Sequence, residues 1–151
     1  MSESTESSID IAAEPAAVMA IIADIAAYPQ WSDGIVSVEV LSVYEDDNRP
    51  ADARFQVESG LIKDTYELEY EWDGDASVSW TLTKGELLKA MNGSYTLEVN
   101  GHGTTTVNYR LSVDVKIPMI GAMKRKAEKV IIDTALKGLK KRVESGPPPA
   151  A

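Results

Sequence analysis

The middle of the chain, residues 35–115, alternates apolar and polar side chains with a period of two, which is typical of half-buried β-strands. Turn-forming residues interrupt this pattern roughly every 8–15 residues. Six strands are therefore predicted, over residues 35–44, 53–58, 62–72, 77–83, 87–99 and 104–115. Asp73-Gly74 and Asn100-Gly101 are suited to tight hairpins, so consecutive strands should pair antiparallel. With a first strand over residues 7–11, we expect a seven-stranded meander.

One face of this sheet should be apolar and aromatic. In residues 66–72, Tyr66, Leu68, Tyr70 and Trp72 alternate with three glutamates, so the aromatic side chains share one face and the carboxylates the other. Residues 107–115 follow the same rule with valine, tyrosine and leucine at alternate positions. An apolar sheet face must be covered by another element.

The segment between Pro118 and Gly146 is the predicted cover. It has helix-forming composition, and about 25 residues of helix would span roughly 37 Å. Its predicted apolar stripe consists of Met119 or Ile120, Met123, Ala127, Val130, Ile131, Thr134 and Gly138. Near the other end of the chain, Pro15 opens a short apolar helix, and Pro29 ends it with at most one further turn.

These elements predict an α+β fold. A curved antiparallel sheet of seven strands wraps around a long C-terminal helix, and two short helices follow the first strand. The chain of 151 residues fits a single domain, which we place at residues 5–145. Residues 146–151 (GPPPAA) cannot continue a helix and are expected to form a disordered, proline-rich tail.

Composition excludes several kinds of site. There is no cysteine, so disulfides, thiolate metal sites and cysteine nucleophiles are ruled out. A single histidine, His102, excludes any site with two imidazoles, and its Asn-Gly-His-Gly setting favours an exposed turn. No motif for a nucleotide and no cluster of metal ligands occurs, so neither a cofactor nor a metal is expected.

The charge pattern limits the partners. The net charge is −9, although residues 118–144 hold eight basic and three acidic side chains. An acidic body should repel nucleic acid. The basic segment could contact an anionic membrane or partner, but a solvated helix face is the favoured interpretation. No apolar run is long enough to span a bilayer and the first residues are polar and acidic, so a cytoplasmic location is expected.

Several short motifs point to one family. The segment Ile9-Asp10-Ile11, followed by Ala13 and Pro15, and above all the segment Tyr28-Pro29-Gln30-Trp31, resemble the START-like (helix-grip) superfamily. The resemblance is greatest to its polyketide cyclase/dehydrase and lipid-transport branch, which includes coenzyme-Q-binding START-like proteins. It covers roughly residues 7–144 and implies an apolar small molecule held between sheet and helix, with or without catalysis.

The inward side chains form the candidate binding site. They combine aromatic residues, whose buried polar atoms need hydrogen-bond partners, with methionines that adapt to a ligand. The predicted lining residues are Trp31, Phe55, Val57, Tyr66, Tyr70, Trp80, Met91, Tyr95, Leu97, Tyr109, Leu111, Met123, Ala127 and Ile131. For any single one of them an ordinary core position is the favoured interpretation, and for Trp31 a structural anchor is favoured.

Asp64 is the best candidate for an acid or base, because a carboxyl half-buried beside tyrosines would have a raised pKa. The favoured alternative places it in solvent beyond the rim of the sheet. Three functions remain open: a carrier or binder of a lipid, polyketide or isoprenoid quinone; a cyclase/aromatase in which tyrosines or Asp64 move protons; and a regulatory interaction module with a structural core. Binding without catalysis is favoured. The sequence identifies neither the ligand nor the oligomeric state.

Overall fold

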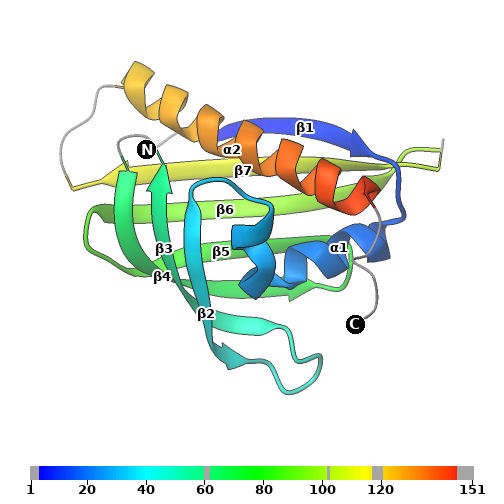
Figure 1. Cartoon of the computed structure of the whole chain (residues 1–151), viewed down its shortest axis with the longest axis horizontal. Helices are drawn as coiled ribbons and strands as arrows, with labels where there is room; N and C mark the ends of the chain where they lie inside the picture. Colours follow the sequence, from blue (N-terminus) through cyan, green and yellow to red (C-terminus); the bar gives the residue numbers. More distant parts are fainter. Residues whose placement is uncertain (1–3, 60–61, 102, 117–120, 146–151) are drawn as a thin grey trace.

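The computed structural model describes residues 4–59, 62–101, 103–116 and 121–145. It contains seven strands and three helical segments (Figure 1). The strands are β1 (Thr5–Ile11), β2 (Ile35–Val43), β3 (Pro50–Ser59), β4 (Ile62–Asp73), β5 (Ser77–Gly85), β6 (Leu88–Val99) and β7 (Thr105–Val115). The helical segments are α1 (Pro15–Ala23), the 3-10 helix η1 (Ile25–Gln30) and α2 (Gly121–Glu144). The predicted α+β architecture is confirmed.

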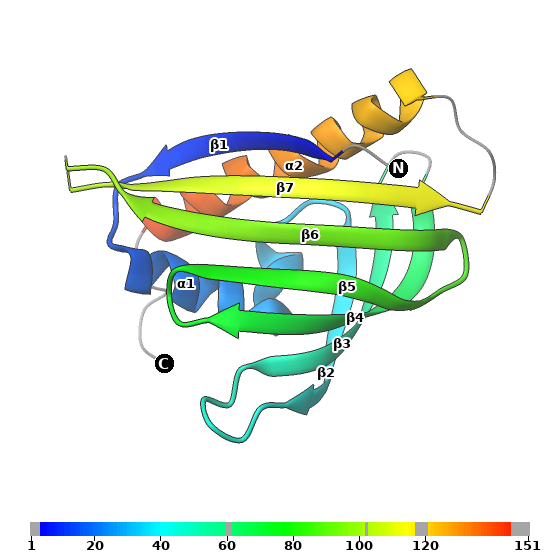
Figure 2. The ribbon, with the colours of Figure 1, turned by 180° about the vertical axis from the view of Figure 1, so that it is seen from behind.

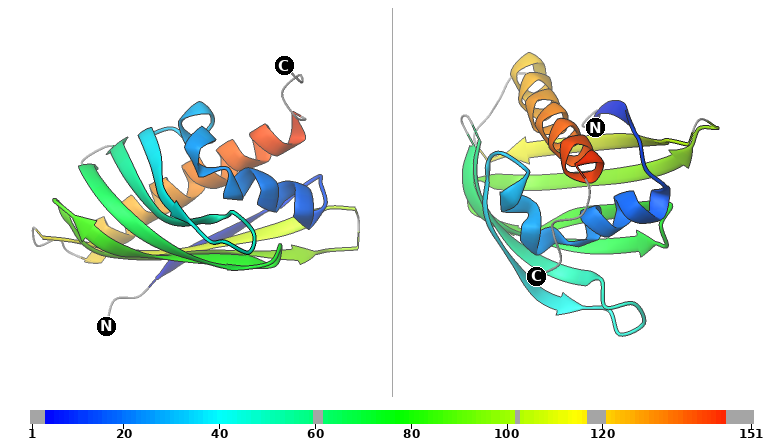
Figure 3. Two further views of the ribbon diagram at one scale, coloured as in Figure 1. Left: turned by 90° about the horizontal axis from the view of Figure 1, so that it is seen from below. Right: turned by 45° about the vertical axis from the view of Figure 1, so that its right-hand side comes forward.

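All strands belong to one antiparallel sheet with the order β1-β7-β6-β5-β4-β3-β2. Strands β2 to β7 form the predicted meander, but β1 pairs with β7, so the expectation of a meander through all seven strands is wrong. The reason is that α1 and η1 carry the chain from β1 across the concave face to the far edge of the sheet (Figures 1 and 3). The two edge strands are therefore β1 and β2.

Two hairpin turns lie at the glycines where the sequence predicted them. Gly74 and Gly101 have φ values of 52° and 65°, a left-handed conformation that glycine adopts without a steric penalty. They occupy the Asp-Gly and Asn-Gly positions at which sharp turns were predicted. The exposed turn predicted for His102, the stripe positions Met119 and Ile120, and the tail 146–151 lie outside the described residues.

The two short helices close one end of the sheet. Pro15 stands at the start of α1, where its missing amide hydrogen costs nothing, and Val18, Met19 and Ile22 are fully buried. Pro29 lies within η1. The hydroxyl of Tyr28 donates a hydrogen bond to the carbonyl of Ile22 and so connects the two helices.

Helix α2 lies in the concave face of the sheet (Figure 3), while no helix among the described residues covers the convex face seen in Figure 2. The buried residues of α2 are Glu128, Ile132, Ala135, Leu136 and Leu139. The predicted stripe is therefore wrong in its register. Met123 and Val130 are 48% and 51% exposed, because the helix is rotated so that a carboxylate, Glu128, occupies the buried face. No helix among the described residues is long and apolar enough to cross a membrane.

Glu128 fixes α2 to the edge of the sheet. Its carboxylate is 1% exposed and accepts hydrogen bonds from the hydroxyl of Thr5 at 2.7 Å and from the backbone N–H of Val113 at 2.7 Å. The ammonium group of Lys124, one turn earlier, lies 2.6 Å from it. The buried charge is thus paired and hydrogen bonded, as a charge in a protein interior must be.

Candidate functional site

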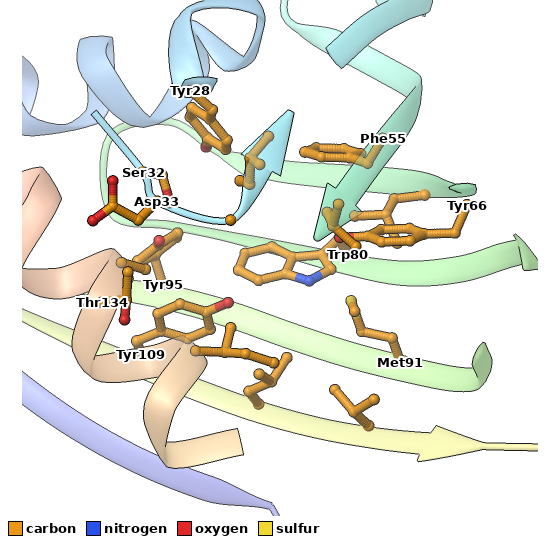
Figure 4. A pocket seen from close by; sticks show the side chains of 18 of the residues that line it. Tyr28, Ser32, Asp33, Phe55, Tyr66, Trp80, Met91, Tyr95, Tyr109 and Thr134 are labelled. Carbon is orange, nitrogen blue, oxygen red and sulfur yellow. The ribbon is translucent and has the colours of Figure 1, made fainter. Parts of the chain in front are cut away.

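A cavity lies between the concave face of the sheet and α2 (Figure 4). Its volume is about 100 Å³. The structure brings most of the predicted residues to this cavity: Trp31, Phe55, Val57, Tyr66, Tyr70, Trp80, Met91, Tyr95, Tyr109, Leu111 and Ile131. That they contact a guest remains a prediction.

Three predicted residues do not line the cavity. Leu97 is 6% exposed and belongs to the core, but it lies two positions beyond Tyr95 along β6, past the end of the cavity. Met123 is 48% exposed, so its expected inward orientation is wrong. Ala127 is partly buried and lies beside the buried face of α2. Both helix positions were misplaced because the buried face of α2 contains Glu128.

Other lining residues were not among the predicted binding residues. Leu68, Leu88 and Val113 share the inward face of their strands, so alternation alone could have indicated them. Thr134 belongs to the predicted stripe of α2, whereas Ala135 comes from the corrected face of that helix. Tyr28 comes from η1, residues 32–34 from the loop that follows it and Ile35 from the start of β2; no periodic pattern marks such a loop as part of a site.

Trp80 lies at the centre of the cavity wall (Figure 4). It pairs with Gly93 on the neighbouring strand, and a Cβ atom at Gly93 would come within 2.3 Å of the indole. Glycine at this position therefore lets the indole lie flat against β6. The rings of Tyr95 and Tyr109 pack against the same indole, with centroids 5.4 and 5.6 Å from it.

Trp31 lies where η1 meets α2. A Cβ atom at Gly138 would be 2.3 Å from the backbone oxygen of Trp31, so this glycine allows the helix to approach closely. The Trp31 ring also packs edge-on against Tyr28, with centroids 4.9 Å apart, and lines the cavity. Its indole nitrogen is buried without a hydrogen-bond partner among the described residues. Trp31 is thus both an anchor between elements and a wall of the cavity.

Four tyrosine hydroxyls in the cavity are unpaired. Tyr66, Tyr70, Tyr95 and Tyr109 are between 3% and 8% exposed as whole residues and line the cavity. Their hydroxyls make no hydrogen bond to another described residue, and they are not among the fully buried polar atoms, so water in the cavity can reach them. Burial raises the pKa of each phenol above its ordinary value of 10.0, so these groups stay protonated at neutral pH. They are hydrogen-bond donors in the wall of the cavity.

Asp64 lies neither in the wall of the cavity nor in solvent beyond the rim of the sheet, the two positions considered for it. It is 4% exposed, so the expected place in solvent is wrong, and it does not line the cavity. One carboxylate oxygen accepts hydrogen bonds from the backbone N–H groups of Thr65 at 2.7 Å and Glu86 at 3.1 Å. The other accepts from the N–H of Leu88 at 2.9 Å. Asp64 therefore anchors the turn between β5 and β6.

The substitution Asp64→Asn tests this anchoring role. An asparagine keeps one acceptor oxygen and turns an amide toward the remaining backbone donor, so we expect the free energy of unfolding to fall by roughly 1–3 kcal/mol. Urea denaturation measures the change. Asp52→Asn, which alters an exposed acceptor for the Ser42 hydroxyl, is the control and should change it by less than about 0.5 kcal/mol. Equal effects of the two substitutions would contradict the anchoring role.

The cavity is poor in charge. Within the described part of the chain, Asp33 is its only charged lining residue. No group of three histidine, aspartate or glutamate side chains among the described residues is arranged to hold a metal ion. An apolar and aromatic wall with a few polar atoms is the usual composition of a site for a small organic molecule.

The comparisons with known proteins agree with this geometry. Residues 2–144 match the family described as polyketide cyclase/dehydrase and lipid transport. The chain belongs to this family. No curated protein matches the sequence. Family and fold together indicate a polyketide cyclase/dehydrase or a START-like protein that binds a hydrophobic ligand.

Solved structures share the fold at low sequence identity. A START superfamily protein from Mycobacterium smegmatis is 24% identical, with a TM-score of 0.87 over 94% of this chain and 97% of that one. A protein from Thermus thermophilus is 22% identical, with a TM-score of 0.80 over 97% and 100%. The Zhui aromatase/cyclase from Streptomyces sp. R1128 is 12% identical, with a TM-score of 0.78 over 95% and 94%. These similarities show the helix-grip fold of START-like proteins.

Proposed function

We propose that this protein binds a hydrophobic small molecule, of the lipid, polyketide or isoprenoid quinone class, in the cavity between the sheet and α2. The observation that supports the proposal most is the set of four tyrosines that line the cavity and whose hydroxyls make no hydrogen bond to another described residue. Inside the cavity these hydroxyls can form hydrogen bonds only with water or with a guest. A guest with hydrogen-bond acceptors would pair these hydroxyls while its apolar part covers the aromatic walls.

The residues of the cavity favour binding over a cyclase reaction. Cyclisation of a poly-ketone needs a group that removes a proton from carbon, but the buried tyrosines hold their own protons. Asp64 accepts hydrogen bonds from three backbone N–H groups and is not among the residues that line the cavity. Asp33 is exposed to solvent, so its carboxylate lacks the burial that tunes a catalytic base. A purely structural core, the third alternative, would not need a cavity lined by unpaired donors.

A substitution that fills the cavity tests the proposal. Ala135 on α2 is buried and lines the cavity, so a phenyl group placed there by Ala135→Phe would occupy the space of a guest. With 2-isopropylnaphthalene as the probe, we expect binding to the unaltered protein and at least a tenfold rise in Kd for the variant. Isothermal titration calorimetry measures the affinity.

Ala122→Phe is the matched control, because Ala122 is exposed on the same helix and does not line the cavity. It should bind the probe as the unaltered protein does. Circular dichroism must show that both variants are folded. The proposal is wrong if folded unaltered protein does not bind the probe, or if Ala135→Phe binds it with undiminished affinity.

A further inference from the structure

We propose that the cavity selects a neutral guest with a carbonyl-type oxygen, bound by the hydroxyls of Tyr95 and Tyr109, and rejects a guest of the same shape with a carboxylate. This inference depends on the proposed function and names the chemistry of its ligand. Three features of the cavity support it: the position of the two tyrosines, the protonation of their hydroxyls and the charge of the lining residues.

Tyr95 and Tyr109 form a cross-strand pair that makes one end of the cavity wall polar. Tyr95 on β6 and Tyr109 on β7 are direct partners in the sheet, and their ring centroids are 4.5 Å apart. The next inward pairs along these strands are Gly93 with Leu111 and Met91 with Val113. At about 3.4 Å per residue, Met91 lies about 14 Å from Tyr95. Along β6 and β7 the cavity therefore changes from hydroxyl-bearing to apolar.

Both hydroxyls act as donors. Tyr95 and Tyr109 are 4% and 6% exposed, and their hydroxyls have no hydrogen-bond partner among the described residues. Burial keeps the pKa of both phenols well above 10.0. A carbonyl oxygen has two lone pairs and can accept from two phenols. In Figure 4 the Tyr109 hydroxyl points into the cavity toward the indole of Trp80.

The charge of the lining residues disfavours an anionic guest. Among the described residues the cavity includes no lysine, arginine or histidine, and its one charged side chain is the carboxylate of Asp33. A carboxylate guest would leave water without a cation to pair with it and would meet a second negative charge. Burying an unpaired charge is costly, whereas a carbonyl group with hydrogen-bond donors is accommodated easily.

Three naphthalenes of nearly identical shape test this selectivity: 2-acetylnaphthalene, 2-isopropylnaphthalene and 2-naphthoate. Their substituents have three heavy atoms each and differ in polarity and charge. By calorimetry at neutral pH, the unaltered protein should bind the ketone most tightly and the carboxylate at least tenfold more weakly than the ketone. Tyr95→Phe and Tyr109→Phe should each raise Kd for the ketone roughly three- to tenfold and leave Kd for the isopropyl compound unchanged.

Tyr44→Phe is the control, since its hydroxyl donates to the carbonyl of Tyr70 and it does not line the cavity; it should not change the order of affinities. Binding of the isopropyl compound without any preference for the ketone would overturn this inference and leave the proposed function standing. Naphthoate bound as tightly as the ketone would overturn it too, as would Tyr→Phe variants that weaken all three compounds equally. Failure of all three to bind would count against the proposed function itself.

Discussion

The substitution Glu128→Ala is expected to lower the free energy of unfolding by roughly 3–5 kcal/mol, because it removes the acceptor of a buried backbone N–H and one half of a largely buried ion pair. The carboxylate joins α2 to both β1 and β7 through Thr5 and Val113, and it pairs with Lys124. Urea denaturation measures the loss. A change of this size is a large part of the stability of a typical domain.

Asp133→Ala separates this effect from that of an ordinary helix ion pair. Asp133 pairs with Lys129 in the same i,i+4 arrangement on the same helix, but the two side chains are 37% and 61% exposed. Exposed pairs contribute little, so the control should cost less than about 0.5 kcal/mol. If Glu128→Ala is no more destabilising than Asp133→Ala, Glu128 does not hold the helix on the sheet.

The substitution Gly93→Ala should impair both stability and binding. Its Cβ atom would come within 2.3 Å of the Trp80 indole, so the indole must move from its place against β6 into the cavity. We expect a loss of roughly 1–3 kcal/mol in the free energy of unfolding and weaker binding of 2-isopropylnaphthalene. Urea denaturation and calorimetry on the same preparation measure the two effects.

Gly121→Ala is the matched control, since a Cβ atom there meets no atom of the described residues closer than 3.7 Å. Alanine at that position should leave both quantities nearly unchanged. If Gly93→Ala has the stability and the Trp80 fluorescence of the unaltered protein, the close contact between Gly93 and Trp80 does not shape the cavity.

Strand alternation made most of the sheet and its inward face predictable. Each strand from β2 to β7 lies within a few residues of its expected range, since apolar and polar side chains alternate there and Gly74 and Gly101 stand at the turns. The partner of β1 was not predictable in the same way. Pairing of β1 with β7 is a contact between segments far apart in the sequence, and local patterns carry no information about it.

The helix side of the cavity was harder to predict. An apolar stripe chosen by side-chain type leaves out Glu128, because glutamate is charged. In the structure Glu128 is buried, since three hydrogen-bonding partners make the burial of its carboxylate favourable. This rotation exposes Met123 and Val130 and brings Ala135 to the cavity. For Asp64, the sequence shows a carboxylate on the inward parity of its strand, but the backbone donors it accepts from become visible only when the next hairpin is folded.

The pairing of β1 with β7 has a consequence for how the molecule folds. Ala12 donates its backbone N–H to Glu144, and Lys140 donates to the carbonyl of Asp10. The end of β1 and the residue after it are thus joined to the end of α2 by contacts that span 132 and 130 residues. Contacts of such long range slow the search for the native state. During synthesis on a ribosome, the apolar concave face of the sheet therefore stays uncovered until α2 has emerged. In that interval the nascent chain is most exposed to aggregation or to capture by a chaperone.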